Sequence, residues 1–289
     1  MIGGRTRLAA VIGAPIAHSM SPAILNAAFA ARGLDWVYLA FEVPEGGAGR
    51  ALDAVRALGI EGLSVTMPHK AAVIPGLDRL DEDAEALGAV NCVWRDGGRL
   101  VGSNTDGAGF VDALRVDHGV DPAGRRCLVV GAGGAGRSVA RALGLAGASE
   151  VVVVNRSEGP ARHAASLAGP AGRVGTAAEA ADADLVVNAT PLGMGAPAAS
   201  GTTPDPLPID PGGLGPGQVV ADLVYHPLET PLLVAARARG ATVVDGLGML
   251  VHQAGHAFRR WTAQDPPLAE MSRAARTAIS RPAGEGSCS

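Results

Sequence analysis

The sequence predicts an α/β protein of two domains, and three observations predict it. The chain has 289 residues, about twice the roughly 150 residues of an average domain. Apolar residues make up 47% of the chain and charged residues 18%, a balance that supplies a core and excludes a disordered chain. Short apolar runs of β type alternate with segments of helical spacing along most of the sequence, which is the pattern of a parallel α/β fold.

The composition excludes several classes of function. A net charge of −4 and an aromatic content of 3% offer neither the basic stripe nor the stacking surface of a nucleic-acid-binding protein. No run of about 18 uncharged apolar residues is present to span a membrane. We therefore expect neither a nucleic-acid nor a membrane partner.

The cysteines indicate the compartment. Cys92, Cys127 and Cys288 are odd in number and form no CxxC pair, so a reducing, cytoplasmic location is expected. Arg5 and Arg7 precede an apolar run, as in a signal peptide. A first β-strand is the favoured interpretation of that run, because nothing downstream resembles a secreted protein.

The first 105 residues alternate between strand and helix. Leu8–Ile12 reads as a strand. Ser21 is expected to cap a helix whose first residue is Pro22 and which Gly33 ends. The remaining expected elements are strands at 36–43 and 62–67, a short helix at 51–58, and a hairpin of strands 90–94 and 100–104.

The middle of the chain repeats the alternation more strictly. Its short apolar runs fit strands that helices cover on both faces: Cys127–Val130, Val151–Val154, Leu185–Val187, Val219–Val224 and Thr242–Val244. Residues 195–217 hold six Gly and six Pro and predict an irregular loop. From Gly246 to about Ile279 the pattern is helical, and we expect this segment to pack on the first domain. Arg281–Ser289 is expected to be disordered.

A glycine-rich turn follows the first of these runs. Gly131, Gly133 and Gly136 form a GxGxxG motif between that strand and a helical pattern at 138–145. Such a turn lets a pyrophosphate approach the backbone at a helix N-terminus, where free N–H groups hold the anion. A structural glycine turn is the alternative, but the order strand, turn and helix favours dinucleotide binding.

The end of the next strand selects the cofactor. An NAD site places Asp or Glu there to accept the ribose 2′-hydroxyl. This strand ends in Asn155-Arg156-Ser157, and the Arg156 guanidinium can hold a 2′-phosphate. The sequence therefore predicts NADP, with Glu158 as a counter-signal.

Several motifs, met in order from about Val11 to Trp261, resemble the shikimate dehydrogenase family, including its quinate/shikimate relatives. They are Gly13–Pro22 (GAPIAHSMSP), Ser64–Lys70 (SVTMPHK), Gly88–Asn91 (GAVN), Asn104–Gly107 (NTDG), Gly131–Gly136 (GAGGAG), Asn155–Ser157 (NRS), Asn188–Met194 (NATPLGM), Asp222–Pro227 (DLVYHP) and Gly246–Gln253 (GLGMLVHQ).

The resemblance implies an NADP-dependent, reversible reduction of 3-dehydroshikimate to shikimate, on the route to chorismate and the aromatic amino acids. It implies a substrate-binding catalytic domain formed by residues 1–106 and 246–289, with a Rossmann domain, residues 107–245, inserted between them.

The resemblance also assigns site residues. Ser19 and Ser21 would hold the substrate carboxylate with Tyr225 nearby. Thr66, Lys70, Asn91, Asp106 and Gln253 would surround the ring hydroxyls, with Lys70 and Asp106 as the catalytic pair. The cofactor would contact Gly131, Gly133, Gly134, Ala135, Gly136, Asn155, Arg156, Ser157, Thr190, Met194, Leu223 and Gly246.

The chemistry of these residues supports the assignment independently. Neutral hydroxyls ahead of a helix suit a carboxylate, although Ser21 alone would read as a cap. Reduction of a ketone builds negative charge on oxygen, which calls for a proton donor such as Lys70. Lys70 is the only lysine beside 23 arginines. Whatever bias replaced lysine with arginine elsewhere in the chain, it left Lys70 in place. Arginine cannot release its proton near neutral pH and so could not act as a proton donor at this position.

Other candidates receive no catalytic role. His252 and His256 lie four apart on a helix, but no third ligand is evident, so no metal is expected. His69 adjoins Lys70, and on an extended segment neighbouring side chains point in opposite directions, which argues against His69 as a base. Arg162 stands two positions late to join Arg156 at a 2′-phosphate.

Three alternatives stay open: an NAD-linked quinate/shikimate dehydrogenase, a non-catalytic ligand sensor on the same scaffold, and an oxidoreductase for another cyclic hydroxy acid. The retained Lys70 and Asp106 argue against the sensor. A homodimer is also left open by the sequence.

Overall fold

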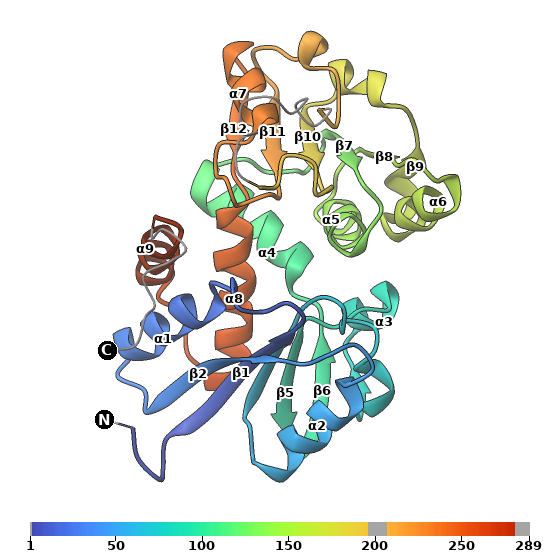
Figure 1. Ribbon diagram of the computed structural model, residues 1–289. Helices are drawn as coiled ribbons and strands as arrows, with labels where there is room; N and C mark the ends of the chain where they lie inside the picture. Colours follow the sequence, from blue (N-terminus) through green and yellow to red (C-terminus); the bar gives the residue numbers. More distant parts are fainter. Residues whose placement is uncertain (1, 196–206, 281–289) are drawn as a thin grey trace. The chain divides into compact units, whose positions relative to one another are not determined.

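The computed structural model describes residues 2–195 and 207–280, and its chain forms two compact units (Figure 1). Unit 1 comprises the described residues up to Thr105 and from Val251 onward, and unit 2 is Asp106–Leu250. The sequence predicted domain boundaries after residues 106 and 245. In the structure, by contrast, Asp106 and the first turn of the helix that begins at Leu247 belong to unit 2.

Unit 1 contains a mixed six-stranded sheet in the order β2-β1-β3-β5-β6-β4. Its strands are β1 (Arg7–Gly13), β2 (Trp36–Glu42), β3 (Gly62–Val65), β4 (Arg79–Leu80), β5 (Cys92–Asp96) and β6 (Arg99–Ser103). Strand β1 runs parallel to both β2 and β3, whereas β5 is antiparallel to β3 and β6. The predicted hairpin is thus confirmed, and its first strand, β5, runs against its neighbours in the otherwise parallel sheet.

Helices cover both faces of this sheet. They are α1 (Ser21–Ala31), α2 (Ala48–Ala57), α3 (Glu82–Leu87), α8 (Leu247–Thr262, from Val251 in this unit) and α9 (Leu268–Ile279). Ala10 and Ile12 of β1 pack with α2 and α3. On the other face, Phe29 of α1 stacks on Phe258 of α8, at 5.6 Å between ring centroids. The C-terminal helices pack on the first domain as the sequence predicted.

Unit 2 contains six parallel strands in the order β12-β11-β10-β7-β8-β9. They are β7 (Arg126–Val130), β8 (Glu150–Val154), β9 (Gly172–Val174), β10 (Leu185–Asn188), β11 (Val219–Asp222) and β12 (Thr242–Val244). Five were predicted as apolar runs, whereas β9 was missed. The strand order reverses between β7 and β10, the point at which doubly wound sheets bind ligands.

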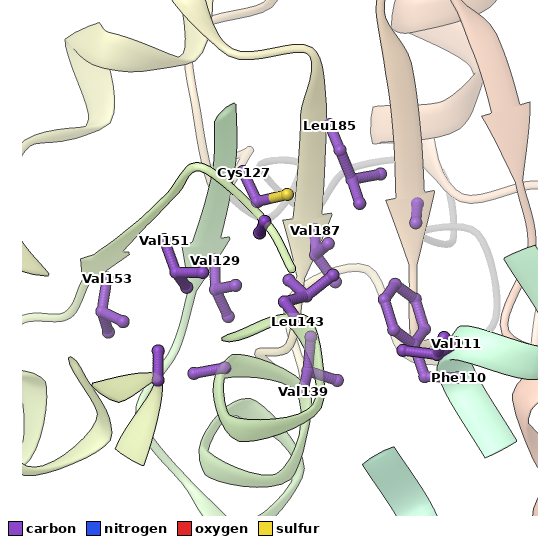
Figure 2. Packing of buried hydrophobic residues seen from close by; sticks show 14 of the residues in the cluster. Phe110, Val111, Cys127, Val129, Val139, Leu143, Val151, Val153, Leu185 and Val187 are labelled. Carbon is purple, nitrogen blue, oxygen red and sulfur yellow. The ribbon is translucent and has the colours of Figure 1, made fainter. Parts of the chain in front are cut away.

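The helices of unit 2 divide between the two faces of the sheet. They are α4 (Asp106–Asp112), α5 (Gly134–Leu145), α6 (Glu158–Leu167) and α7 (Pro231–Ala238). Val129 and Val151 pack against Val139 and Leu143 of α5 in one core (Figure 2). Their sequence neighbours, such as Leu128, pack in a second core with α7. Burial on both faces explains the continuous apolar runs.

Four charged side chains form a closed set of ion pairs in unit 2. Arg126 and Arg173 each contact both Glu150 and Glu179, with N···O distances of 2.5 to 2.8 Å. These pairs join β7, β8 and β9 to the 3-10 helix η4 (Ala177–Asp182). The hydrogen bond from Arg173 lowers the pKa of Glu179 to about 2, with a further contribution from the Thr176 backbone N–H.

Two expectations fall partly outside the described residues. Of the loop predicted at 195–217, residues 196–206 are not described, and the remainder contains one 3-10 turn, η5 (Pro211–Gly213). The tail at 281–289 is likewise not described. Over the described ranges, no helix is both long and apolar enough to cross a membrane.

Glu179→Gln tests the contribution of this ion-pair set to acid stability. A carboxyl whose folded pKa is depressed stabilises the fold above its unfolded pKa, and this stability is lost as the pH falls towards the folded value. Between about pH 4.5 and 2, the unfolding free energy of the wild type should therefore fall more steeply than that of Glu179→Gln. Urea denaturation at several pH values measures it. Asp182→Asn is the control, because Asp182 is 72% exposed and 3.9 Å from Arg126; parallel curves for Glu179→Gln and the wild type would contradict the account.

Candidate functional site

The loop after β1 carries Ser19 and Ser21. The predicted cap at Ser21 is wrong: Met20 is the N-cap residue, and Ser21 is the first residue of α1. The Ile24 N–H donates to the Met20 carbonyl at 3.1 Å, which starts the helix one residue earlier than expected. The Ser19 hydroxyl accepts from the Ser21 N–H at 3.3 Å. Both serines are half-buried, and the structure brings them together at the start of a helix.

The segment after β3 carries Thr66 and Lys70, and it is a turn. The strand was expected to continue to Met67 but ends at Val65, and the His69 N–H donates to the Thr66 carbonyl at 2.9 Å. The extended geometry assumed for His69 and Lys70 is therefore wrong. His69 is 1% exposed, whereas Lys70 is half-buried. The Lys70 carbonyl accepts from the Val90 N–H at 2.8 Å, which ties the turn to the residues just before β5.

Asn91 and Gln253 meet through a residue that the sequence did not single out. The Thr105 N–H donates to Asn91 Oδ1 at 2.8 Å, and Asn91 Nδ2 donates to Thr105 Oγ1 at 3.0 Å. Thr105 Oγ1 also contacts the Gln253 carbonyl at 3.1 Å, and Asn91 Nδ2 lies 3.5 Å from Gln253 Oε1. Thr105 lies within the NTDG motif, which was the only available signal. It holds two predicted site residues in one cluster.

Asp106 directly follows Thr105 and begins α4 in unit 2. It is 7% exposed. Tyr225, in the loop after β11, is half-buried, and burial raises the pKa of its hydroxyl. The predicted substrate residues are thus distributed over both units.

The three glycines of the GxGxxG motif have different surroundings at the end of β7. Gly131 has φ of 106°, and a Cβ there would lie 2.9 Å from the Ala189 carbonyl oxygen. At Gly136 a Cβ would collide with the Gly131 carbonyl oxygen. Gly133 is the N-cap of α5 and, like Gly134, has open space around its missing side chain among the described residues. The first and third glycines therefore serve packing, and the second leaves backbone N–H groups accessible to an anion.

Gly136→Ala is expected to lower the unfolding free energy by about 1–3 kcal/mol, because overpacking costs that much in a tight site. Gly134→Ala is the control: it lies in open space in the same helix turn, where Ala is a better helix former than Gly. Chemical denaturation of both variants measures the difference. Equal stability of Gly136→Ala and the wild type would contradict a steric clash at this position.

The segment after β8 offers one cation for a phosphate. Asn155 Nδ2 donates to the Ser157 carbonyl at 3.0 Å, which shapes the turn, and Arg156 is exposed. Arg162 pairs with Glu158 at 2.6 Å, one helical turn apart on α6. The carboxylate of Glu158 is thus engaged by Arg162, while Arg156 extends into solvent.

Buried polar side chains connect the ends of β10 and β11. Asn188 Oδ1 accepts from the Thr190 N–H and hydroxyl at 3.0 and 2.7 Å, and Asn188 Nδ2 donates to Asp222 Oδ1 at 2.9 Å. Asp222 Oδ2 accepts from the Thr230 hydroxyl at 2.7 Å. Burial raises the pKa of Asp222, and these hydrogen bonds partly oppose the shift. Asn188, Asp222 and Thr230 were not predicted as site residues, yet they fix Thr190.

The other predicted cofactor residues lie near these strand ends. A Cβ at Gly246 would collide with the Leu223 carbonyl oxygen, so the chain passes too close there for any side chain. Met194 is 59% exposed.

The two histidines considered as metal ligands lie on α8, where His252 is buried and His256 is half-buried. Over the described ranges, no group of three or more His, Cys, Asp or Glu side chains could hold a metal ion.

Three family models match this chain. The model described as shikimate dehydrogenase substrate binding domain matches residues 11–93, and that of the shikimate 5'-dehydrogenase C-terminal domain matches residues 246–276. Between them, residues 126–209 match the model described as NADP oxidoreductase coenzyme F420-dependent.

Curated and solved relatives cover nearly the whole chain. A shikimate dehydrogenase (NADP(+)) from Moorella thermoacetica is 46% identical over 96% of each chain. The structure of a shikimate 5-dehydrogenase from Thermus thermophilus, in complex with NADP(H) and shikimate, is 39% identical with a TM-score of 0.85, over 94% of this chain and 99% of that one. A quinate dehydrogenase from Corynebacterium glutamicum in complex with NAD is 34% identical, with a TM-score of 0.84, over 94% and 99%.

Proposed function

The chain belongs to the shikimate dehydrogenase family, and from this we propose that it catalyses the NADP-dependent, reversible reduction of 3-dehydroshikimate to shikimate. The observation that carries the proposal is Lys70. The only lysine of the chain stands half-buried at the end of a turn that backbone hydrogen bonds hold on both sides. A group that must gain and lose a proton needs this kind of fixed position.

We propose that Ser19 and Ser21 bind the substrate carboxylate. Their hydroxyls lie at the start of α1, where the positive end of the helix dipole favours an anion. Neither serine brings a competing charge. Tyr225 adds a neutral, half-buried hydroxyl, whose pKa burial raises, and we assign it to the same carboxylate.

The ring hydroxyls are assigned to Thr66, Asn91, Gln253 and Asp106. Thr105 bonds both the oxygen and the nitrogen of the Asn91 amide, which fixes its orientation. Thr105 also binds the backbone carbonyl of Gln253, and Gln253 Oε1 lies 3.5 Å from Asn91 Nδ2. Fixed donors and acceptors select a substrate by the pattern of its hydroxyls, because a missing partner leaves a buried polar group unpaired. This cluster supports a polyhydroxylated cyclic substrate.

Lys70 is assigned the proton transfer. When bound, the nicotinamide supplies or accepts the hydride. As the carbonyl oxygen gains negative charge, the Lys70 ammonium donates a hydrogen bond and then its proton, and in the oxidative direction the neutral amine takes the hydroxyl proton. Asp106 is proposed to stabilise the charged ammonium.

The cofactor site fits NADP on its own geometry. Gly133 and Gly134 leave the first turn of α5 open, and Gly131 takes a positive φ, as a pyrophosphate loop requires. We assign the adenosine end to Asn155, Arg156 and Ser157, and the nicotinamide end to Thr190, Met194, Leu223 and Gly246. Arg156, exposed and cationic, would hold the 2′-phosphate.

The structure of a quinate dehydrogenase in complex with NAD supports an NAD-linked quinate/shikimate dehydrogenase as the second candidate. At the ribose position this chain has Asn155 and Arg156 and no acid, which disfavours NAD.

We also propose a cytoplasmic location, because Cys92 and Cys127 are both free and buried, and free thiols persist in a reducing compartment.

Arg156→Ala should raise the KM for NADP⁺ about tenfold to a hundredfold, because a charge-assisted contact to phosphate is lost. The KM for NAD⁺ should hardly change, since NAD⁺ has no 2′-phosphate. Arg162→Ala is the matched control and should raise the KM for NADP⁺ less, because Arg162 is paired with Glu158. Steady-state kinetics with both cofactors measure the effect; an equal rise for NADP⁺ and NAD⁺ would contradict it.

Lys70→Arg should lose nearly as much kcat as Lys70→Ala, by roughly the 10²–10⁴-fold that general acid–base catalysis contributes. Arginine keeps the charge but cannot release the proton. NADP⁺ binding, measured by calorimetry, should survive in both variants. A Lys70→Arg enzyme within a few-fold of the wild type would leave Lys70 as an electrostatic contact only.

A further inference from the structure

Three loops leave the carboxyl ends of β1, β2 and β3, and hydrogen bonds join these strand ends and their loops. The Val43 N–H, after β2, donates to the Gly13 carbonyl at 3.0 Å. The Ala14 N–H donates to the Met67 carbonyl, also at 3.0 Å. His69 Nε2 lies 2.7 Å from the Val43 carbonyl. We call this set of residues, Gly13, Ala14, Val43, Met67 and His69, the three-loop junction.

His69 supplies the side-chain bond of the junction. A carbonyl oxygen can only accept, so Nε2 carries the hydrogen and donates it. The residue is 1% exposed, and its backbone is also engaged: its N–H donates to the Thr66 carbonyl at 2.9 Å, and its carbonyl accepts from the Val73 N–H at 3.1 Å. His69 is therefore fixed both through its backbone and through its imidazole ring.

The loops are packed closely where they meet. A Cβ at Gly13 would lie 2.5 Å from Thr66 Cγ2 and 3.1 Å from the Met67 carbonyl oxygen. Such an approach leaves little space for the loops to shift relative to one another.

Two groups assigned to the substrate depend on this junction. The loop from Gly13 and Ala14 leads to Ser19 and Ser21, and the turn from Thr66 to His69 ends in Lys70. We propose that His69 is a positioning residue, whose bond to the Val43 carbonyl fixes the Lys70 turn relative to the loop of the carboxylate-binding serines. The inference rests on the proposed function and deepens it. It explains why a histidine next to the catalytic lysine is buried and turned away from solvent.

The test is a series of variants at His69, assayed with shikimate and NADP⁺ well below the melting temperature of each variant. His69→Phe fills the space without a donor, and His69→Asn has an amide too short to reach Val43. Each should lower kcat by about tenfold to a hundredfold, as small misplacements of a catalytic group do, and should raise the KM for shikimate. The KM for NADP⁺ should stay unchanged. His69→Gln, whose amide nitrogen reaches the position of Nε2, should recover most of the lost kcat.

Arg95→Met is the control for general loss of stability. The Arg95 guanidinium donates to the carbonyls of Ile60, Val55 and Arg56, which also ties backbone segments of unit 1 but does not involve the junction. It should lower the melting temperature and leave kcat unchanged. If it reduced kcat as much as His69→Asn at equal loss of stability, or if His69→Phe and His69→Asn kept wild-type kcat and KM, the inference would be overturned.

The uniqueness of Lys70 gives a second readout that does not depend on turnover. The acylation rate of Lys70 by an amine-selective reagent, followed by mass spectrometry, should change in His69→Asn and return towards the wild-type rate in His69→Gln. An unchanged rate in His69→Asn would overturn the inference even if activity fell. A wild-type enzyme inactive with shikimate and either cofactor would instead refute the proposed function, and the acylation rates would still decide the role of His69.

Discussion

In both units, parallel strands bring distant loops to one edge of a sheet. Hydrogen bonding between parallel strands places their carboxyl ends side by side, and the loops that leave those ends become neighbours. In unit 2, β7 and β10 pair directly, which puts Gly131 next to Ala189 and Thr190. In unit 1, β1 pairs with both β2 and β3, which makes the junction between Gly13, Val43 and Met67 possible. The positions of the candidate site residues on these loops are therefore set first by strand pairing and only then by contacts between side chains.

Strand pairing brings the loops together, and buried polar side chains then fix them. Asn188, Asp222 and Thr230 hold the loop of Thr190, and Thr105 holds Asn91 and Gln253. Buried hydrogen-bonding groups are costly to leave unpaired, so a satisfied network favours one arrangement over its alternatives. His69 and Val43 follow the same rule at the turn of Lys70.

The sequence predicted the elements that a local residue pattern indicates. It missed contacts between residues that lie far apart in the chain. Continuous apolar runs identified five strands of unit 2, because each is buried on both faces. Strand β9, Gly172–Val174, has one apolar residue and gave no such signal. The expected cap at Ser21 was wrong, because a serine followed by proline does not determine which residue starts the helix. Asp222 was not singled out, since its partners lie 34 residues before it and eight after it. Lys70, in contrast, stood out because the chain has no other lysine.

Initial rates for shikimate and quinate, each with NADP⁺ and with NAD⁺, test the central claim most directly. The account predicts the highest kcat/KM for shikimate with NADP⁺. This prediction rests on Lys70, on the cluster of Asn91, Thr105 and Gln253, and on the cation at Arg156. Substitution of either the substrate or the cofactor should lower kcat/KM clearly. A higher kcat/KM for quinate with NAD⁺ would contradict the account.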